Sequence, residues 1–383
     1  MKKLVLSGKR IITGQDSLSY LKELTYQRVI IVTGGSSMQR FGIIEQAKKY
    51  LSDAGAKVMV HSGIQKNPTM EEVEAGLAVF KQFQPDCVLA IGGGSAIDAA
   101  KAMLLFYEFP FLNFDNVLDY NAKGKIPSTR DTALICVPST SGTGSEVTRG
   151  TVITDTRQEL KVPIMTDCLR PDVAILDAKL TATMPKQIVA ETGMDALTHA
   201  IEAYINHNLD DFDEALCAGA IVGIMKWLPI SYEQETLEAR EKVHNYQAMA
   251  GIGFANVGLG MVHGIAHSFG AAYNMAHGLT NAIILPFALE YNSRDAHVAE
   301  KLAHLSYLCK CDDIIEEISK LKKRLGIPNS FQEAGITEEM YQEKYNLLLV
   351  HAMLGATNVN PVKMTEAEME KMLSTVYYGR KLF

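Results

Sequence analysis

The sequence lacks the cysteine pattern of a disulfide-stabilised or zinc-finger protein. Its six cysteines are scattered without a CxxC pair: Cys87, Cys136, Cys168, Cys217, Cys309 and Cys311. In a chain of 383 residues, such thiols are typical of an ordinary hydrophobic core. Cys309 and Cys311 are separated by one residue and have no second pair, so they are weak candidates for metal ligands.

Long basic tracts and membrane-length apolar runs are also missing. There are 37 Lys and Arg against 44 Asp and Glu, a net charge of −7, and the short stretch KLKKR at 320–324 is typical of a solvated helix face. No apolar run approaches the roughly 18 to 20 residues that span a bilayer, and MKKLVLSGKR has too short an apolar segment for a signal peptide. We therefore expect a cytoplasmic protein that binds neither nucleic acid nor a membrane.

The composition is that of a folded chain with more than one domain. Apolar residues make up 47% and charged residues 21%, and 383 residues exceed what one hydrophobic core usually organises. In the first half, short apolar runs at 28–33, 57–62 and 86–91 alternate with amphipathic stretches at 41–53 and 70–84. This alternation predicts βαβ units and a parallel sheet covered on both faces.

The pattern changes in the second half of the chain. Further strand-like segments at 132–138, 150–154 and 172–177 are followed by long helical stretches such as 186–205 and 237–255. We predict an α/β domain over 1–180 and an all-α domain over 181–383.

Two loops rich in glycine and hydroxyl groups follow predicted strands. AIGGGSAIDAAKAM at 90–103 predicts a strand that turns into a helix, with Ser95 and Asp98 as a capping box, although it lacks the GxGxxG spacing. PSTSGTGSEVT at 138–148 follows another strand. Loops at the carboxyl ends of parallel strands bind ligands, and a helix N-terminus attracts phosphate, so we predict a nucleotide site. The alternatives are a plain turn and a hydroxyl-rich surface loop.

Histidines with a four-residue spacing occur in apolar helical segments. Asp195 and His199 share one helix face, with Glu202 one turn further on, and His263 and His267 repeat the spacing before His277. Such a set supplies five candidates, one Asp and four His, for a divalent metal that needs four ligands. Each histidine taken alone is more often a hydrogen-bonded core residue, but the group favours a common explanation.

Four long motifs occur in the order found in one enzyme family: GGGSAIDAAKA, PSTSGTGSEVT, GMDALTHAIEAY and GMVHGIAHSFGAAYNMAHG. The chain resembles the iron-dependent (group III) alcohol dehydrogenases, the family of lactaldehyde reductase, 1,3-propanediol dehydrogenase and bacterial butanol dehydrogenases. The resemblance runs nearly end to end. It implies a dehydroquinate synthase-like architecture, with an α/β nucleotide-binding domain and a helical metal-binding and catalytic domain, and a homo-oligomer, a dimer or larger.

The resemblance also assigns roles to single residues. It implies that Asp195, His199, His263 and His277 bind the metal, Fe(II) or alternatively Zn(II), and that His267 stays off the metal and faces substrate and nicotinamide. Phe254 would limit the substrate pocket, with a core aromatic as the alternative. The residues that match the dinucleotide site are Gly35, Ser36, Asn67, Gly93, Gly94, Ser95, Asp98, Ser139, Thr140, Thr143, Thr148, Lys161 and Leu180.

One departure from the family pattern concerns the nucleotide. Many NAD-using members have an Asp after the first strand of the domain, where this chain has Gly35 and Ser36. A ribose 2′-hydroxyl loses its carboxylate partner there, and a 2′-phosphate is no longer repelled. We therefore expect NADP(H) to be favoured over NAD(H).

The expected function is reversible, metal-dependent reduction of a small aldehyde to a primary alcohol by NAD(P)H. An alternative is a lyase of the dehydroquinate-synthase type, which needs several Lys and Arg around the metal to hold a polyanion, and 190–285 supplies almost none. A non-catalytic metal-binding or redox-sensing module is the third hypothesis.

Overall fold

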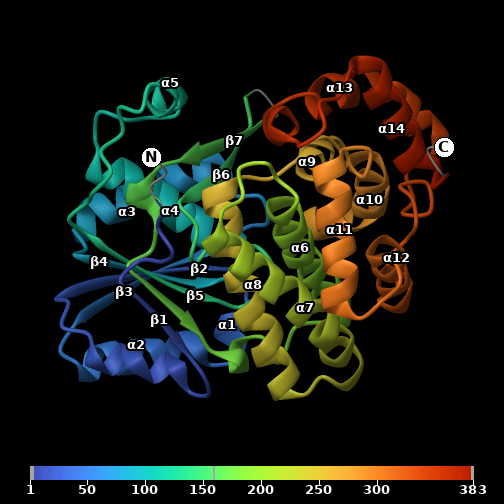
Figure 1. The fold of residues 1–383 in the computed structure, drawn as a ribbon. Coiled ribbons are helices and arrows are strands. Elements are labelled where there is room, and N and C mark those ends of the chain that lie inside the picture. Colours follow the sequence, from blue (N-terminus) through green and yellow to red (C-terminus); the bar gives the residue numbers. More distant parts are fainter. Residues whose placement is uncertain (1–3, 158–159, 381–383) are drawn as a thin grey trace. The chain divides into compact units, whose positions relative to one another are not determined.

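The computed structural model describes residues 4–157 and 160–380, and these residues form two compact units (Figure 1). Of these residues, 4–140 and 144–183 belong to unit 1, and 141–143 and 184–380 belong to unit 2. A parallel α/β fold followed by a helical fold confirms the predicted fold class. The assignment of nucleotide binding to 1–180 and of metal binding to 181–383 stays a prediction.

Unit 1 is built on a six-stranded sheet in the order β1-β8-β5-β4-β2-β3, with every neighbouring pair parallel. Successive residues of the central strands face opposite sides, and both sides are apolar. Ile30 of β2 lies in one buried cluster, whereas Val29 and Ile31 lie in the other. The strands are β1 Arg10–Thr13, β2 Arg28–Gly34, β3 Lys57–Ile64, β4 Cys87–Gly92, β5 Ala133–Pro138 and β8 Val173–Leu176.

Helices cover both faces of this sheet. Apolar residues of α3 and α4 pack on one face, and those of η1, α1 and α2 pack on the other. The helices of unit 1 are η1 Ser17–Glu23, α1 Ser37–Arg40, α2 Ile43–Asp53, α3 Met70–Phe83, α4 Gly94–Glu108, α5 Val117–Ala122, η2 Asp167–Leu169 and η3 Ala178–Leu180. The βαβ arrangement predicted for the first half is therefore present.

Two strands have no counterpart in the sequence-based prediction. β1 has four residues and pairs only with β8, so it is too short to give a clear pattern. β7, Leu160–Met165, contains Pro163, which lowers the expectation of a strand, yet it pairs antiparallel with β6, Gly150–Asp155. The predicted strand at 150–154 thus belongs to a separate two-stranded sheet.

Unit 2 is helical. Its elements are α6 Lys186–Tyr204, α7 Asp211–Gln234, α8 Leu237–Val257, α9 Met261–Tyr273, α10 His277–Asn292, α11 Ala296–Cys309, α12 Ile314–Arg324, α13 Glu338–Ala352, η4 Gly355–Val359 and α14 Glu366–Tyr378. α6 contacts α7, α8 and α10, and it is buried on every side from Val189 onward. Gly258, with a φ of 105°, ends α8, and α9 departs at an angle of 104°. After this turn, α9 packs mainly against α10, α13 and η4, which follow it in sequence.

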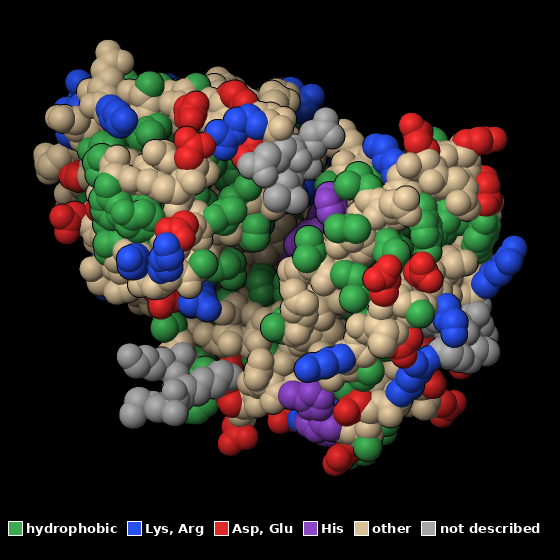
Figure 2. All heavy atoms as spheres, turned by 90° about the horizontal axis from the view of Figure 1, so that it is seen from above, with side chains coloured by type: hydrophobic (Ala, Val, Ile, Leu, Met, Phe, Trp, Pro, Cys, Tyr) green, Lys and Arg blue, Asp and Glu red, His purple; other side chains and the backbone are tan. Residues whose placement is uncertain are grey.

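One helix among the described residues is apolar and long enough to cross a membrane by length and composition. This is α7, with 24 residues and a mean hydropathy of 1.4 in its most apolar window, of which 44% is buried. It packs against α6 and α8, as a core helix does. On the face drawn in Figure 2, acidic and basic side chains are interspersed.

Two detailed expectations are wrong. Ser95 and Asp98 do not form a capping box: α4 begins at Gly94, its N-cap is Gly93, and no side chain caps it. The stretch 320–324 is only partly a solvated face, because Lys322 of α12 is 3% exposed and its ammonium lies 5.5 Å from the centre of the Phe287 ring. Burial lowers the pKa of Lys322 to about 8. The six cysteines are free, as expected, with Cys309 and Cys311 partly buried.

Candidate metal and nucleotide sites

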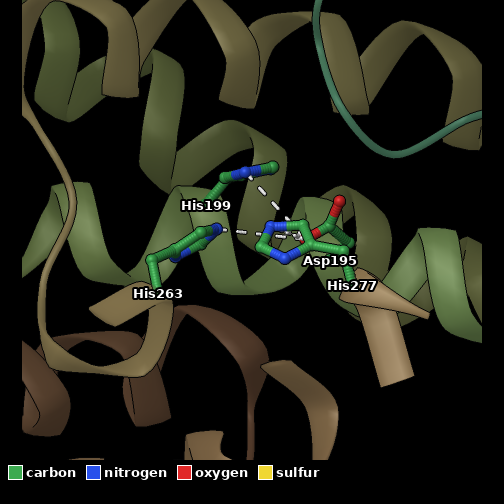
Figure 3. Close-up of side chains that lie close together, drawn as sticks. All are labelled: Asp195, His199, His263 and His277. Carbon is green, nitrogen blue, oxygen red and sulfur yellow. Dashed lines mark ion pairs between the residues drawn. The ribbon is translucent and has the colours of Figure 1, made fainter. Parts of the chain in front are cut away.

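Four predicted ligands lie together within unit 2. Asp195 and His199 come from α6, His263 from α9, and His277 is the first residue of α10 (Figure 3). One ligand atom from each lies within 4.8 Å of the others. Asp195, His199 and His263 are buried, whereas the His277 side chain is 31% exposed. The i,i+4 spacing on α6 accounts for the first pair, and the turn before α9 supplies the third residue.

The carboxylate of Asp195 faces all three imidazoles. Its Oδ1 atom lies 4.0 Å from Nε2 of His199, 4.0 Å from Nε2 of His263 and 3.7 Å from Nε2 of His277. The Nδ1 atoms of two rings have partners outside the cluster: the carbonyl of Gly142 at 3.3 Å from His199, and Oε2 of Glu202 at 2.5 Å from His263. A carbonyl can only accept, so Nδ1–H of His199 donates and the Nε2 lone pair faces the cluster.

The protonation of these groups suits a cation. Burial lowers the pKa of His199, and it lowers the pKa of His263 well below its usual value with further help from the neighbouring histidines. These two imidazoles are therefore neutral, the form that binds metal. Burial raises the pKa of Asp195, an effect opposed by His199 and by a hydrogen bond from Asn281. A divalent cation would offset the cost of that buried carboxylate.

Two further polar residues complete the cluster and were missed as functional residues. Glu202 accepts from the backbone N–H of Val262 at 2.8 Å as well as contacting His263, and burial raises its pKa to about 8. Asn281 is fully buried. Its Nδ2 donates to Asp195 Oδ1 at 2.7 Å and lies 3.1 and 3.2 Å from Nε2 of His263 and His277.

A sequence signal existed for both residues. Glu202 follows His199 by three positions, and Asn281 follows His277 by four, so each shares a helix face with a candidate ligand. The spacing alone does not separate such residues from ordinary buried polar groups.

The fifth candidate, His267, lies beside the cluster. Its ring is stacked on His277 with a centroid separation of 5.1 Å and lies 6.1 Å from the ring of His263. Phe254 of α8 stacks on His199 at 4.3 Å, with an angle of 18° between the rings. Phe254 is therefore in contact with the ligand set, and its role in limiting the substrate pocket stays a prediction.

The two glycine and hydroxyl loops converge in unit 1. The backbone N–H of Ser139 donates to the carbonyl of Gly92 at 2.8 Å. A Cβ atom at Gly93 would lie 3.5 Å from the methyl group of Thr140. The start of α4 at Gly94 and Ser95 thus lies beside the loop after β5, which is the arrangement expected of a nucleotide site at the carboxyl ends of parallel strands.

Asp98 and Thr148 stabilise this region through protein contacts. Asp98 accepts from the Ser145 hydroxyl and from the backbone N–H of Val152, each at 3.0 Å. Lys101 is buried and donates to the carbonyls of Thr148 at 2.8 Å and Gly150 at 2.9 Å. These contacts hold the loop 138–148 and the hairpin β6–β7 against α4.

The other residues predicted to bind the nucleotide occupy varied places. Lys161 donates to Asn67 Oδ1 at 3.0 Å, and Asn67 has a left-handed backbone with a φ of 54°. Leu180 is 2% exposed and belongs to the apolar cluster that η1, α1 and α2 form with one face of the sheet. Thr143 lies in the short segment Ser141–Thr143 that belongs to unit 2. Gly35 and Ser36 are exposed after β2.

Comparison with known proteins supports one family over almost the whole chain. A family model described as "Iron-containing alcohol dehydrogenase" matches residues 8–178. A second, described as "Fe-containing alcohol dehydrogenase family, C-terminal", matches residues 189–377. The chain therefore belongs to the iron-containing alcohol dehydrogenases, which are oxidoreductases that interconvert alcohols and aldehydes.

Individual relatives agree with this assignment. The NADPH-dependent butanol dehydrogenase of Clostridium saccharobutylicum is 40% identical over 381 residues, covering 97% of each chain. The alcohol dehydrogenase of Thermococcus barophilus is 35% identical over 383 residues, covering 96% of this chain and 98% of that one. The iron-containing alcohol dehydrogenase structure from Thermococcus thioreducens has a TM-score of 0.91 at 35% identity, covering 99% of this chain and 100% of that one. These matches confirm the resemblance and the predicted class of enzyme.

Proposed function

We propose that this chain interconverts small primary alcohols and aldehydes, with Fe(II) held by Asp195, His199, His263 and His277, and with NADP(H) as the favoured nicotinamide. Zn(II) is the alternative metal, because the same ligands accept both ions. The observation that carries the proposal is the buried cluster of one carboxylate and three imidazoles within 4.8 Å.

The donor set fits a divalent ion of the first transition row. Neutral Nε2 atoms and one carboxylate suit iron or zinc, and the Nδ1 contacts of His199 and His263 fix the ring orientations. A bound ion would supply Lewis-acid polarisation of the substrate oxygen, and the nicotinamide would exchange a hydride with the substrate carbon. The chain's own contribution is to hold the ligands in place and to keep Asp195, His199 and His263 buried.

The position of His267 supports a role for this residue in proton transfer. Its ring is stacked on His277 and lies beside the ligand set. In this position it would relay the alcohol proton or orient the nicotinamide, as the resemblance implies.

The preference for NADP(H) rests on the loop after β2. Gly35 has a φ of 52°, and the space around a Cβ atom there is open. Its own N–H donates to the carbonyl of Ile64 at 3.2 Å, so donors toward a 2′-phosphate would come from the exposed Ser36 that follows. The relative from Clostridium saccharobutylicum is named NADPH-dependent, which supports the proposal. NAD(H) is the alternative, because a structure of the sulfoacetaldehyde reductase from Bifidobacterium kashiwanohense, 26% identical, contains NAD⁺.

Small primary alcohols are proposed from the relatives' names and from Phe254. Besides the butanol dehydrogenase, a 1-propanol dehydrogenase of Citrobacter freundii is 33% identical over 377 residues. An aromatic ring stacked on a metal ligand leaves limited room on that side of the metal. A homodimer is proposed on the resemblance alone, and a cytoplasmic location is proposed on the sequence features described above.

Metal analysis combined with an aldehyde panel tests the function. Asp195→Ala and His263→Ala should lose both bound metal and turnover while remaining folded, because unit 1 has its own core. His304→Ala removes a histidine of unit 2 that contacts Tyr204 instead, and it should retain both. Stoichiometric metal in both ligand variants would overturn the assignment, and the metal found in the wild type decides between iron and zinc.

The cofactor proposal has a separate test. Wild-type kcat/KM for NADPH should equal or exceed that for NADH. Gly35→Asp should shift the preference toward NADH by roughly 1 to 2 kcal/mol, the scale of a charged hydrogen bond. Asp is also among the residues that tolerate the left-handed backbone found at Gly35. A tenfold or greater wild-type preference for NADH, unchanged in the variant, would contradict it.

A further inference from the structure

The segment Ser141–Thr143 lies between two strands of unit 1 in sequence but packs with the helices of unit 2. Ser141 is 2% exposed and His244 of α8 is fully buried. The Ser141 hydroxyl and Nδ1 of His244 are 2.9 Å apart, a normal hydrogen bond. This contact fastens the segment to α8.

Gly142 is fastened to α6 by close packing. A Cβ atom at this position would lie 2.7 Å from the Thr192 carbonyl oxygen, so only glycine allows the approach. The Gly142 carbonyl oxygen is thereby placed 3.3 Å from Nδ1 of His199. The neighbouring Ser141 is held by His244, so the segment that carries this carbonyl has two attachments, one to α8 and one to α6.

The His199 ring needs such a partner. A neutral imidazole has two tautomers, and only the one with its proton on Nδ1 presents the Nε2 lone pair to the cluster. Phe254 stacks on the ring face and restricts its tilt, but stacking does not select a tautomer. The Gly142 carbonyl selects the tautomer with the proton on Nδ1, because a carbonyl oxygen can only accept a hydrogen bond.

We infer that Ser141 and His244 form a positioning pair that fixes the orientation and tautomer of His199 through the Gly142 carbonyl. The inference rests on the proposed function, since it concerns how firmly the metal is held. The hydrogen bond of His244 goes to Ser141 and not to a metal ligand. Its imidazole is neutral, because burial lowers its pKa to about 4.

A purely structural role is the competing explanation. Any buried serine–histidine hydrogen bond stabilises the fold. A structural pair would change thermal stability alone, whereas a positioning pair changes the rate at which metal leaves the folded protein.

The experiment uses the full-length protein loaded with Co(II) or Zn(II). Ser141→Ala, His244→Leu and the double variant remove the pair, and His244→Asn restores a polar atom at the position of Nδ1. Ser330→Ala is the matched control: Ser330 is 1% exposed, and its hydroxyl accepts from the backbone N–H of Glu333 at 3.1 Å. The readouts are metal release to a chelator, the Co(II) absorption spectrum and Tm.

We expect both single variants to release metal faster by about 10- to 100-fold, the usual effect of losing a partner of a metal-bound histidine. The double variant should release metal no faster than the worse single variant, because the two residues act as one unit. His244→Asn should restore slow release, and Ser330→Ala should lower Tm without changing release or the Co(II) spectrum.

Two failures are distinguishable. A wild-type protein that binds no stoichiometric metal would overturn the proposed function. A wild type that binds metal, with Ser141→Ala and His244→Leu folded and releasing it at the wild-type rate, would overturn only the positioning pair. Should His244→Leu fail to fold, the milder Ser141→Ala and its comparison with Ser330→Ala still decide.

Discussion

Glu202 gives the sharpest prediction about metal affinity. Its Oε2 atom lies 2.5 Å from Nδ1 of His263, and the two side chains are 2% and 1% exposed. Burial raises the pKa of Glu202 in the metal-free protein, but a bound cation nearby favours the ionised carboxylate, which accepts from Nδ1–H of His263. Glu202→Gln keeps the shape but cannot ionise. We expect metal to bind about 10- to 100-fold more weakly, equivalent to about 1.4 to 2.7 kcal/mol. This matches the roughly 1.5 to 3 kcal/mol typical of hydrogen bonds to charged groups.

The assay is competition for metal between the protein and a chelator of known affinity. Glu214→Gln serves as the control, because Glu214 accepts from Lys301 at 2.7 Å and lies outside the ligand set. Its metal affinity should equal that of the wild type. An unchanged metal affinity in Glu202→Gln, with the same Tm loss in both variants, would refute the reasoning.

The same carboxylate can be displaced without being altered. A Cβ atom at Gly260 would lie 2.8 Å from Oε1 of Glu202 and 2.9 Å from Oδ1 of Asn360, so Gly260→Ala requires both side chains or the local backbone to shift. We expect weaker metal binding here too, although the carboxyl group of Glu202 is retained. Wild-type metal affinity in Gly260→Ala would contradict this expectation.

The remaining predictions concern three other residues. His267→Ala should keep the metal and lose on the order of 10²- to 10⁴-fold in kcat, as for a proton-handling group; loss of metal would make it a ligand instead. Asn281→Leu should release metal faster, because the donor to Asp195 Oδ1 at 2.7 Å is lost; wild-type release measured with the same chelator would contradict this. Burial lowers the pKa of His244 from 6.5 in the unfolded chain to about 4 in the folded protein, so its full contribution to the free energy of unfolding is present above pH 6.5. About 3 kcal/mol of that free energy should be lost as the pH falls toward 4. Denaturant titrations of metal-free His244→Asn should lack this part of the wild-type pH dependence.

Periodicity in the sequence was sufficient to predict the βαβ part of the sheet, the helices and the proximity of Asp195 and His199, whereas the choice of four metal ligands among five candidates came from the family resemblance. Asp195 and His199 are four apart on a buried helix, so their proximity follows from helix geometry. Strands that are apolar at every position, such as β4, leave no face for solvent, which requires helices on both sides.

Other features depend on tertiary contacts that leave no local pattern. Asp98 resembled a helix-capping residue, but Ser145 and Val152, distant in sequence, bind its carboxylate instead. Lys322 stands in a basic stretch, yet the packing of α12 buries it. A proline such as Pro163 disfavours a strand because it lacks a backbone N–H. It is tolerated in β7 because this strand pairs with β6 on one side only.

The position of His277 has a consequence for the helix that it begins. α10 has Ala276 as its N-cap, which offers no capping side chain. Its first residue is also the most exposed of the four ligands, at 31% of the side chain. A bound metal would therefore tether the first turn of α10 to α6 and α9 through the His277 side chain, although it would accept no hydrogen bond from the free backbone N–H groups of that turn. Removal of the metal by a chelator should then open the first turn of α10 before the other helices. Amide hydrogen exchange should become faster over that turn before it becomes faster in the buried ends of α6 and α9.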